Sequence, residues 1–132
     1  MGKTMKTEVI GRPPRKEEVR DHFFQFLSQL EAAGVPKVKI TFGFAWGNHV
    51  YKGQWEEELC SPSEVRRRVE VEEGRMTGRI GDNDFHISVP GEGYERTYCH
   101  EAEIHFTADA PHPALQEAID KWTKLGWKVR ER

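Results

Sequence analysis

Hydrophobic residues recur along this chain with two periods, and the longer period predicts two helices. Between positions 15 and 33 the apolar residues fall at three- and four-residue steps, which is the spacing of one face of an α-helix. Gly34 and Pro36 follow this stretch and mark its end. A second stripe with the same spacing lies between Pro113 and Gly126 and consists of Leu115, Ala118, Ile119, Trp122 and Leu125.

The shorter period is a strict alternation of apolar and polar residues, and it predicts β-strands. The clearest case is 38–46, where five apolar residues share one face. Gly47 and Asn48 then predict a turn, after which 50–55 returns as the second strand of a hairpin. Further alternating segments lie at 7–10, 67–72, 75–81, 85–90, 97–106 and 127–130. The three central segments, 67–72, 75–81 and 85–90, are expected to form two successive hairpins.

Residues 61–64 carry the signals of a helix start. Ser61 is a good cap, Pro62 suits the first helical position, and Glu64 completes a capping box. From Val69 onward, however, the alternation favours a strand, so we expect only one helical turn here.

The length of 132 residues is that of a single domain, here expected over 1–132. The order of the elements predicts an α+β fold with one antiparallel sheet in meander order. Two helices packed on one face of this sheet would bury both helical stripes and one sheet face, which gives a two-layer sandwich.

Composition narrows the cellular setting. No apolar run approaches the ~18 residues of a membrane span, so we expect no membrane association. The first residues lack a secretory signal, and a cytoplasmic location is therefore expected. Two cysteines in the whole chain exclude a disulfide scaffold and a four-thiolate zinc site.

Charge is distributed unevenly along the chain. The net charge is −2, yet residues 1–20 carry +3, residues 121–132 carry +4 and the middle carries −9. If the two ends meet in space, they form a basic patch beside an acidic body, which would attract an anionic partner.

One polar face suggests acid–base or metal chemistry. In the alternating segment 97–106, Glu101, Glu103 and His105 share a face with Cys99, and His86 on a neighbouring strand can join them. Carboxylates and histidines at this spacing can bind a divalent metal or transfer protons. The same alternation is also that of any solvated sheet face, which is the more common case. His100 falls on the opposite, apolar face and is expected to be a hydrogen-bonded core residue.

A cluster of aromatic residues at the hairpin of 38–55 suggests a binding surface. Trp46, His49, Tyr51 and Trp55 gather toward the turn, where few apolar neighbours remain to bury them. Tryptophan and tyrosine are enriched at the energetic centres of protein interfaces. The alternative is that these rings belong to the core.

Arginines provide a third candidate. Arg66 and Arg68 enter the expected strand 67–72, and Arg75 and Arg79 lie on the next one, so that one stripe can collect several guanidinium groups for a phosphate or carboxylate. Cross-strand pairing with nearby glutamates is the simpler interpretation.

No motif in the sequence identifies a reaction. We therefore expect a small non-catalytic binding protein, of the inhibitor, immunity or accessory type, that uses the aromatic hairpin and its flanking charge to bind another protein. No cofactor or resident metal is expected. The alternatives are a metal-assisted or acid–base hydrolase that uses Glu101, Glu103, His105 and His86, and a protein that binds a charged small molecule, a nucleotide or a nucleic acid through its basic clusters. A homodimer is compatible with the pattern.

Overall fold

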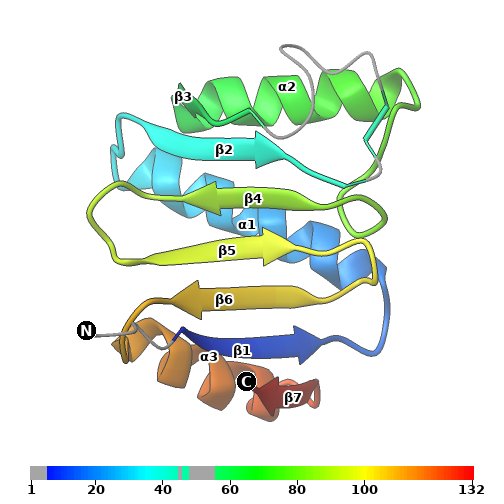
Figure 1. The fold of residues 1–132 in the computed structure, drawn as a ribbon. Coiled ribbons are helices and arrows are strands. Elements are labelled where there is room, and N and C mark those ends of the chain that lie inside the picture. The colour runs from blue at the N-terminus through cyan, green and yellow to red at the C-terminus, as the bar shows by residue number, and fades with distance from the viewer. Residues whose placement is uncertain (1–5, 45, 48–55) are drawn as a thin grey trace.

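The computed structural model describes residues 6–44, 46–47 and 56–132. Seven strands and three helices follow one another along these residues (Figure 1). In chain order they are β1 (Thr7–Arg12), α1 (Glu17–Ala32), β2 (Val38–Phe42), β3 (Glu58–Cys60), α2 (Pro62–Gly74), β4 (Phe85–Ser88), β5 (Tyr94–Tyr98), β6 (Ile104–Ala108), α3 (Pro113–Lys124) and β7 (Lys128–Glu131).

The strands form one open antiparallel sheet in the order β3-β2-β4-β5-β6-β1-β7. Its centre is the consecutive run β4-β5-β6, a meander. The two ends of the described chain meet because β1 lies between β6 and β7, and Arg12 is the register partner of Lys128. The expected α+β class with a single antiparallel sheet is confirmed. The condition set for a basic patch, that the two ends meet in space, is met by the pairing of β1 with β7.

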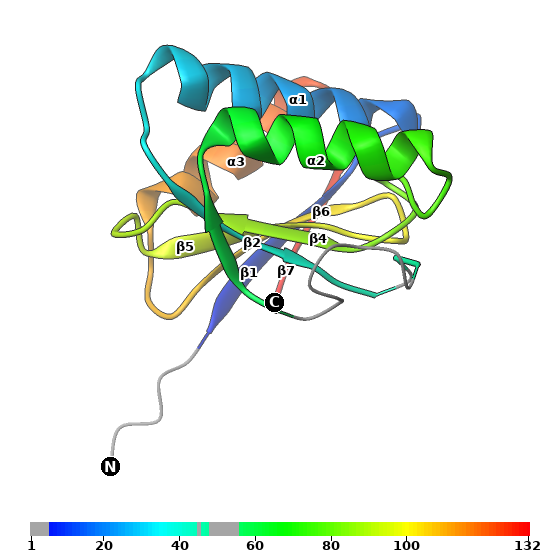
Figure 2. The same ribbon diagram turned by 90° about the horizontal axis from the view of Figure 1, so that it is seen from above.

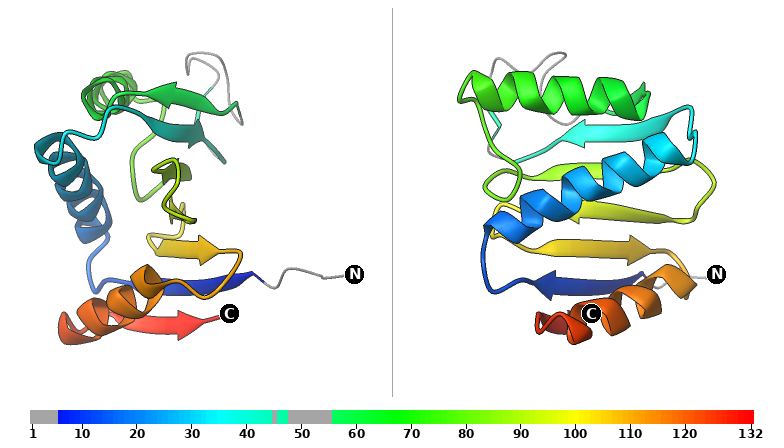
Figure 3. Two further views of the ribbon diagram at one scale, coloured as in Figure 1. Left: turned by 90° about the vertical axis from the view of Figure 1, so that its left-hand side faces the viewer. Right: turned by 180° about the vertical axis from the view of Figure 1, so that it is seen from behind.

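All three helices lie on the same face of the sheet, so the molecule has two layers (Figures 2 and 3). One continuous apolar core fills the space between the layers. From α1 this core receives Val19, Phe23, Phe26, Leu27 and Leu30, the stripe expected from the sequence. The opposite sheet face carries polar residues such as Lys39, Thr41, His86, Thr97 and His105, as period-two alternation requires.

The expected strand 67–72 is wrong, because this segment belongs to helix α2. The Ser61 hydroxyl accepts a hydrogen bond from the Glu64 backbone N–H, and the Glu64 carboxylate accepts one from the Ser61 backbone N–H, which completes a capping box. Val65 and Val69, one turn apart, face the core, whereas Val71 is 44% exposed. The cap and the good helix formers after it therefore outweigh the short alternation that suggested a strand.

Two further expected strands differ in the structure. Within 75–81 the chain forms only an isolated bridge between Ile80 and Asn83. The segment 97–106 is divided between β5 and β6 by a tight turn, which requires a positive φ of 61° at Ala102. His100 lies in this turn and is exposed, so its placement in the core was wrong, although it is hydrogen bonded.

Two glycines permit close packing of tryptophan rings. A Cβ on Gly11 would lie 2.4 Å from the Trp122 ring, so only glycine lets α3 rest its largest side chain on β1. A Cβ on Gly78 would likewise lie 2.3 Å from the Trp46 ring. Among the helices of the described residues, none has the length and hydropathy of a transmembrane segment.

The Gly11 contact gives a test of this packing. We expect Gly11→Ala to lower the free energy of unfolding by about 1–3 kcal/mol, because the new methyl group must displace the buried Trp122 ring. Gly74→Ala is the matched control, since no atom lies within 4 Å of its Cβ position at the end of α2. Urea unfolding of both variants measures the effect, and equal stabilities would contradict the packing described here.

Candidate functional site

A cleft opens between α1 and α3, over strands β5 and β6, and we call it the Arg96 cleft. Its inner lining consists of His22, Phe26, Arg96, Phe106 and Trp122. Gln25 and Gln29 on α1, and Glu117 and Lys121 on α3, are exposed and form its outer walls. The cleft has a volume of about 160 Å³.

Arg96 is a cation on the core-facing side of the sheet. It lies on the same face of β5 as Tyr94 and Tyr98, which are two residues before and after it, and it is the register partner of Phe106 on β6. Its guanidinium carbon lies 3.6 Å from the centre of the Phe26 ring and 4.6 Å from that of Phe106. The positive charge is thus held between the negative faces of two aromatic rings.

The hydrogen bonds of Arg96 are incomplete. Nη2 donates to the Tyr94 hydroxyl at 3.0 Å, and the positive charge of Arg96 also acts on the Tyr98 hydroxyl. Nε is buried and has no hydrogen-bond partner in the described chain. No carboxylate of the described residues forms an ion pair with Arg96. A partly buried charge is therefore left without a counter-charge, which is costly unless something else supplies one.

The pKa of His22 is lowered by its burial in the cleft and by the positive charges nearby. Burial, followed by the charges of Arg96 and Lys121, lowers the pKa of His22 to about 3, so the ring is neutral at pH 7. Its Nδ1 lies 3.0 Å from the Tyr98 hydroxyl. Burial raises the pKa of Tyr98 to about 12, so this hydroxyl keeps its proton.

These bonds fix the direction of the protons in the cleft. The buried Tyr98 hydroxyl keeps its proton and needs an acceptor for it, and His22 Nδ1 is its hydrogen-bond partner among the described residues. Neutral His22 then carries its proton on Nε2 and is a donor there. Arg96 and His22 consequently present donors to the cleft, and Lys121 adds a second cation.

The expected polar face is only partly assembled. Glu103 and His105 do lie together, with 3.6 Å between a Glu103 carboxylate oxygen and His105 Nε2. Glu101 lies in the turn, and β5 separates His86 from β6, with His86 Nδ1 2.9 Å from the Thr97 hydroxyl.

Glu103 is held as a structural anion. Its side chain is 2% exposed and receives hydrogen bonds from Arg12 at 3.0 Å and from Arg130 at 2.8 Å. Burial alone would raise the pKa of Glu103, but the hydrogen bonds from Arg130 and Arg12 outweigh it and hold the pKa below its usual value. A carboxylate that is paired with two arginines is a poor proton acceptor, which argues against an acid–base role.

The aromatic hairpin can be described only in part. Trp46 was a candidate for a binding surface, with the core left open as the alternative, and its ring lies in the core. The ring is 3% exposed, lies edge-on to Phe42 and donates from Nε1 to the Asp84 carbonyl at 2.7 Å. His49, Tyr51 and Trp55 lie outside the described residues, as does the returning strand 50–55. Phe44 remains 52% exposed.

The four arginines do not form a stripe, because the segment that carries Arg66 and Arg68 is helical. Arg66 pairs with Glu31 at 2.9 Å and Arg68 with Glu58 at 2.6 Å. Arg75 caps the end of α2 and lies 3.5 Å from Glu72, and Arg79 is exposed in the following loop. Three of the four arginines do pair with glutamates, but the expected cross-strand geometry is wrong, because these arginines belong to a helix and its end.

Sequence reasoning missed the Arg96 cleft, although the signal was present. The segment Tyr94-Glu95-Arg96-Thr97-Tyr98 alternates, and its buried face contains an arginine where an apolar residue is usual. His22 similarly lies three residues after Val19 in the buried stripe of α1. A charged or titratable residue in an apolar register marks a candidate site.

Comparisons with known proteins do not assign a family to this chain. No family model, no curated protein and no solved structure matches it.

The shifted pKa of His22 predicts a pH dependence of stability. An unfolded chain protonates this histidine near pH 6.5, whereas the folded protein does so only near pH 3. Stability from this site is therefore complete above pH 6.5 and is lost as the pH falls, by up to ~1.4 kcal/mol per unit.

Urea unfolding between pH 6.5 and pH 5 measures this slope. In His22→Gln the free energy of unfolding is expected to change less with pH, by up to ~1.4 kcal/mol per pH unit. The contributions of all other histidines cancel when the two proteins are compared. Equal slopes in the two proteins would show that His22 is not held neutral by the cleft.

Proposed function

We propose that the protein is a non-catalytic binding module whose ligand is a small anion held in the Arg96 cleft. The observation that carries this proposal is the partly buried Arg96 guanidinium, which has no carboxylate partner among the described residues and a buried Nε without a hydrogen-bond partner. Carboxylates and phosphates match the planar donor geometry of a guanidinium group.

The electrostatics of the lining support this choice of ligand. Arg96 and Lys121 contribute two positive charges and Glu117 one negative charge, while the low pKa keeps His22 neutral. An anion beside Arg96 lies in a low-dielectric environment, where its attraction to the guanidinium is stronger than in water.

The size of the cleft limits the ligand. Its volume of about 160 Å³ is below the ~300 Å³ at which drug-sized pockets begin. Inorganic phosphate or a short dicarboxylate fits this space, whereas a whole nucleotide fits only with most of its bulk outside.

The lining also favours binding over catalysis. A histidine with a pKa of about 3 is a weak base at neutral pH, and neither described cysteine lies in the cleft. A hydrolase that uses Glu103 is less well supported, because two arginines neutralise that carboxylate. Binding of another protein through the hairpin 38–55 loses its main described anchor, since Trp46 is buried in the core.

Arg96 gives the first test of the proposal. Inorganic phosphate and succinate are titrated against the protein, with binding heat and thermal stability as the two measurements. We expect at least one anion to bind and to raise the free energy of unfolding by about 2.7 kcal/mol at 100 times its Kd. Arg96→Met is expected to lose this stabilisation, because it removes the charge but keeps an apolar side chain beside Phe26 and Phe106.

Arg67→Gln is the matched control, because this exposed arginine on α2 lies outside the cleft and the variant loses the same charge. The proposal is contradicted if neither anion binds, or if Arg96→Met and Arg67→Gln are stabilised by the anion to the same extent as the unmodified protein.

The two charged residues on α3 give a second test with opposite signs. Lys121→Gln is expected to weaken binding of the same anion, and Glu117→Gln is expected to strengthen it, each by a factor of about 2–10, the range for exposed charges near a ligand. Calorimetric titration at low salt measures both affinities. A loss of affinity in both variants would indicate that α3 acts through its packing and not through charge.

A further inference from the structure

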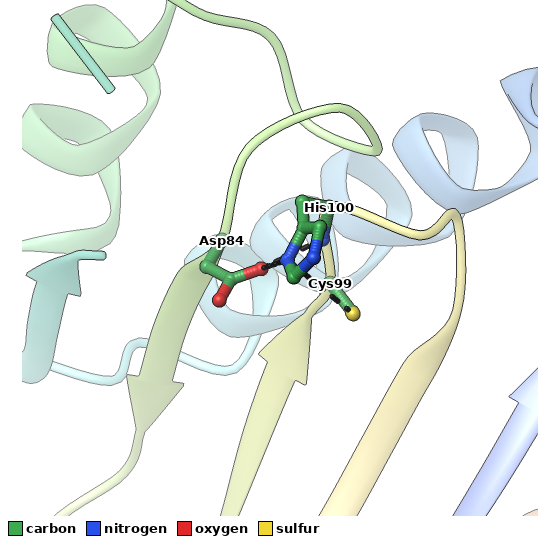
Figure 4. A group of neighbouring side chains, drawn as sticks. All are labelled: Asp84, Cys99 and His100. Carbon is green, nitrogen blue, oxygen red and sulfur yellow. Dashed lines mark hydrogen bonds and ion pairs between the residues drawn. The ribbon is translucent and has the colours of Figure 1, made fainter. Parts of the chain in front are cut away.

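A second group of chemically active side chains lies at the end of the sheet where β4 begins and the turn joins β5 to β6. None of these side chains lines the Arg96 cleft. Asp84 immediately precedes β4, and Cys99 and His100 occupy the turn between β5 and β6 (Figure 4). One ligand atom from each of these three residues lies within 4.8 Å of the others. These atoms are a carboxylate oxygen, a thiol sulfur and an imidazole nitrogen.

The distances are close to those of a metal site. His100 Nδ1 lies 2.8 Å from Asp84 Oδ1 and 4.0 Å from Cys99 Sγ. Tetrahedral zinc, with bonds of about 2.0 Å to nitrogen or oxygen and 2.3 Å to sulfur, separates its ligand atoms by roughly 3.3–3.6 Å. The two observed distances bracket this range, so side-chain rotations alone can bring the three atoms to a shared ion.

The backbone already holds these side chains in place. The turn is closed by bonds from Cys99 N to the Glu103 carbonyl at 2.8 Å and from Ala102 N to the Cys99 carbonyl at 3.1 Å. Glu101 N donates to Cys99 Sγ at 3.4 Å, and His100 N donates to Asp84 Oδ1 at 2.6 Å. Hydrogen bonds of this kind to a ligand atom orient the ligand, and they stabilise the charge of a metal-bound thiolate.

The charge balance distinguishes this group from its neighbour. Cys99, Glu103 and His105 also lie within 4.8 Å of one another, but Glu103 is already paired with Arg12 and Arg130. Asp84 has no arginine or lysine partner within the described chain, and both hydrogen bonds that its carboxylate accepts there come from His100. Among the described residues, Asp84 is therefore paired only with a histidine, whereas Glu103 is paired with two arginines.

We propose that Asp84, Cys99 and His100 form a Zn²⁺ site with three protein ligands and one open coordination position. The thiol ligand selects a soft or borderline transition metal over Mg²⁺ or Ca²⁺. The His100 side chain is 39% exposed, so water can reach an ion held there. On binding, the Cys99 thiol releases its proton to solvent. The imidazole proton moves through solvent from Nδ1 to Nε2, so Nδ1 exchanges its hydrogen bond with Asp84 for a bond to the metal.

The Phe44 ring supports this position of the histidine. It lies 4.8 Å from the centre of the His100 ring and is itself exposed. The imidazole is therefore oriented by three contacts, with Asp84, Cys99 and Phe44, although it is at the surface.

Cobalt substitution tests the site directly. The purified chain is stripped with a chelator, dialysed and titrated with Co²⁺. We expect one equivalent to bind and to give a sulfur-to-cobalt charge-transfer band in the near ultraviolet, which Zn²⁺ then displaces. His100→Gln changes an exposed side chain, so it is expected to fold and to weaken Co²⁺ binding at least tenfold.

Two control variants separate this site from the alternatives. Cys60→Ser is expected to keep the charge-transfer band, because Cys60 lies on β3, away from the turn. His105→Gln is expected to bind Co²⁺ like the unmodified protein. The proposal is overturned if no thiolate band appears, or if His105→Gln loses the band while His100→Gln keeps it, since the ligands would then be Cys99, Glu103 and His105.

Discussion

One guanidinium group lies between the two layers of this protein without a carboxylate partner among the described residues. Arg96 projects from the central strand β5 toward the helices, where its neighbours in the sheet are aromatic. A positive charge in that place must be stabilised. The rings of Phe26 and Phe106, the hydroxyls of Tyr94 and Tyr98, and the open space between α1 and α3 each do part of this. Burial, with the charges of Arg96 and Lys121 added to it, also holds the pKa of His22 low in the same cleft.

The two faces of the sheet accordingly hold charge in different ways. On the helix-free face the ions are paired, as Glu103 is with Arg12 and Arg130, and they form a network that joins the two chain ends. Within the described part of the chain, Arg96 on the helix-covered face has only aromatic and hydroxyl partners. At the end of the sheet, the Asp84 carboxylate has only His100 among the same residues. The two unbalanced charges have opposite signs, and they are the places where an anion and a cation are proposed to bind.

The sequence predicted the architecture better than the sites. Periodicity identified α1, α3, β2, β4 and the terminal strands, because each of these elements buries one regular face. It failed at 67–72, where Val69 and Val71 alternate by chance while the cap at Ser61 sets a helix. Periodicity also left open whether Trp46 is buried. Its ring packs on Gly78, and this is a long-range contact that no local sequence pattern contains. Arg96 was not among the candidates from the sequence, because most arginines face solvent, whereas this one occupies the core-facing register of β5.

The most direct measurement is NMR spectroscopy of the arginine Nε–H groups in the 15N-labelled protein during a titration with phosphate and succinate. A buried Nε–H without a hydrogen-bond partner resonates apart from those of exposed arginines, and it shifts when a carboxylate or phosphate accepts its proton. The account predicts that one resonance, absent in Arg96→Lys, moves with saturating concentration dependence while the exposed arginines move little. If the shifts are instead spread over the exposed arginines and the Arg96 resonance stays in place, the guanidinium is a structural part of the core and not the centre of an anion site.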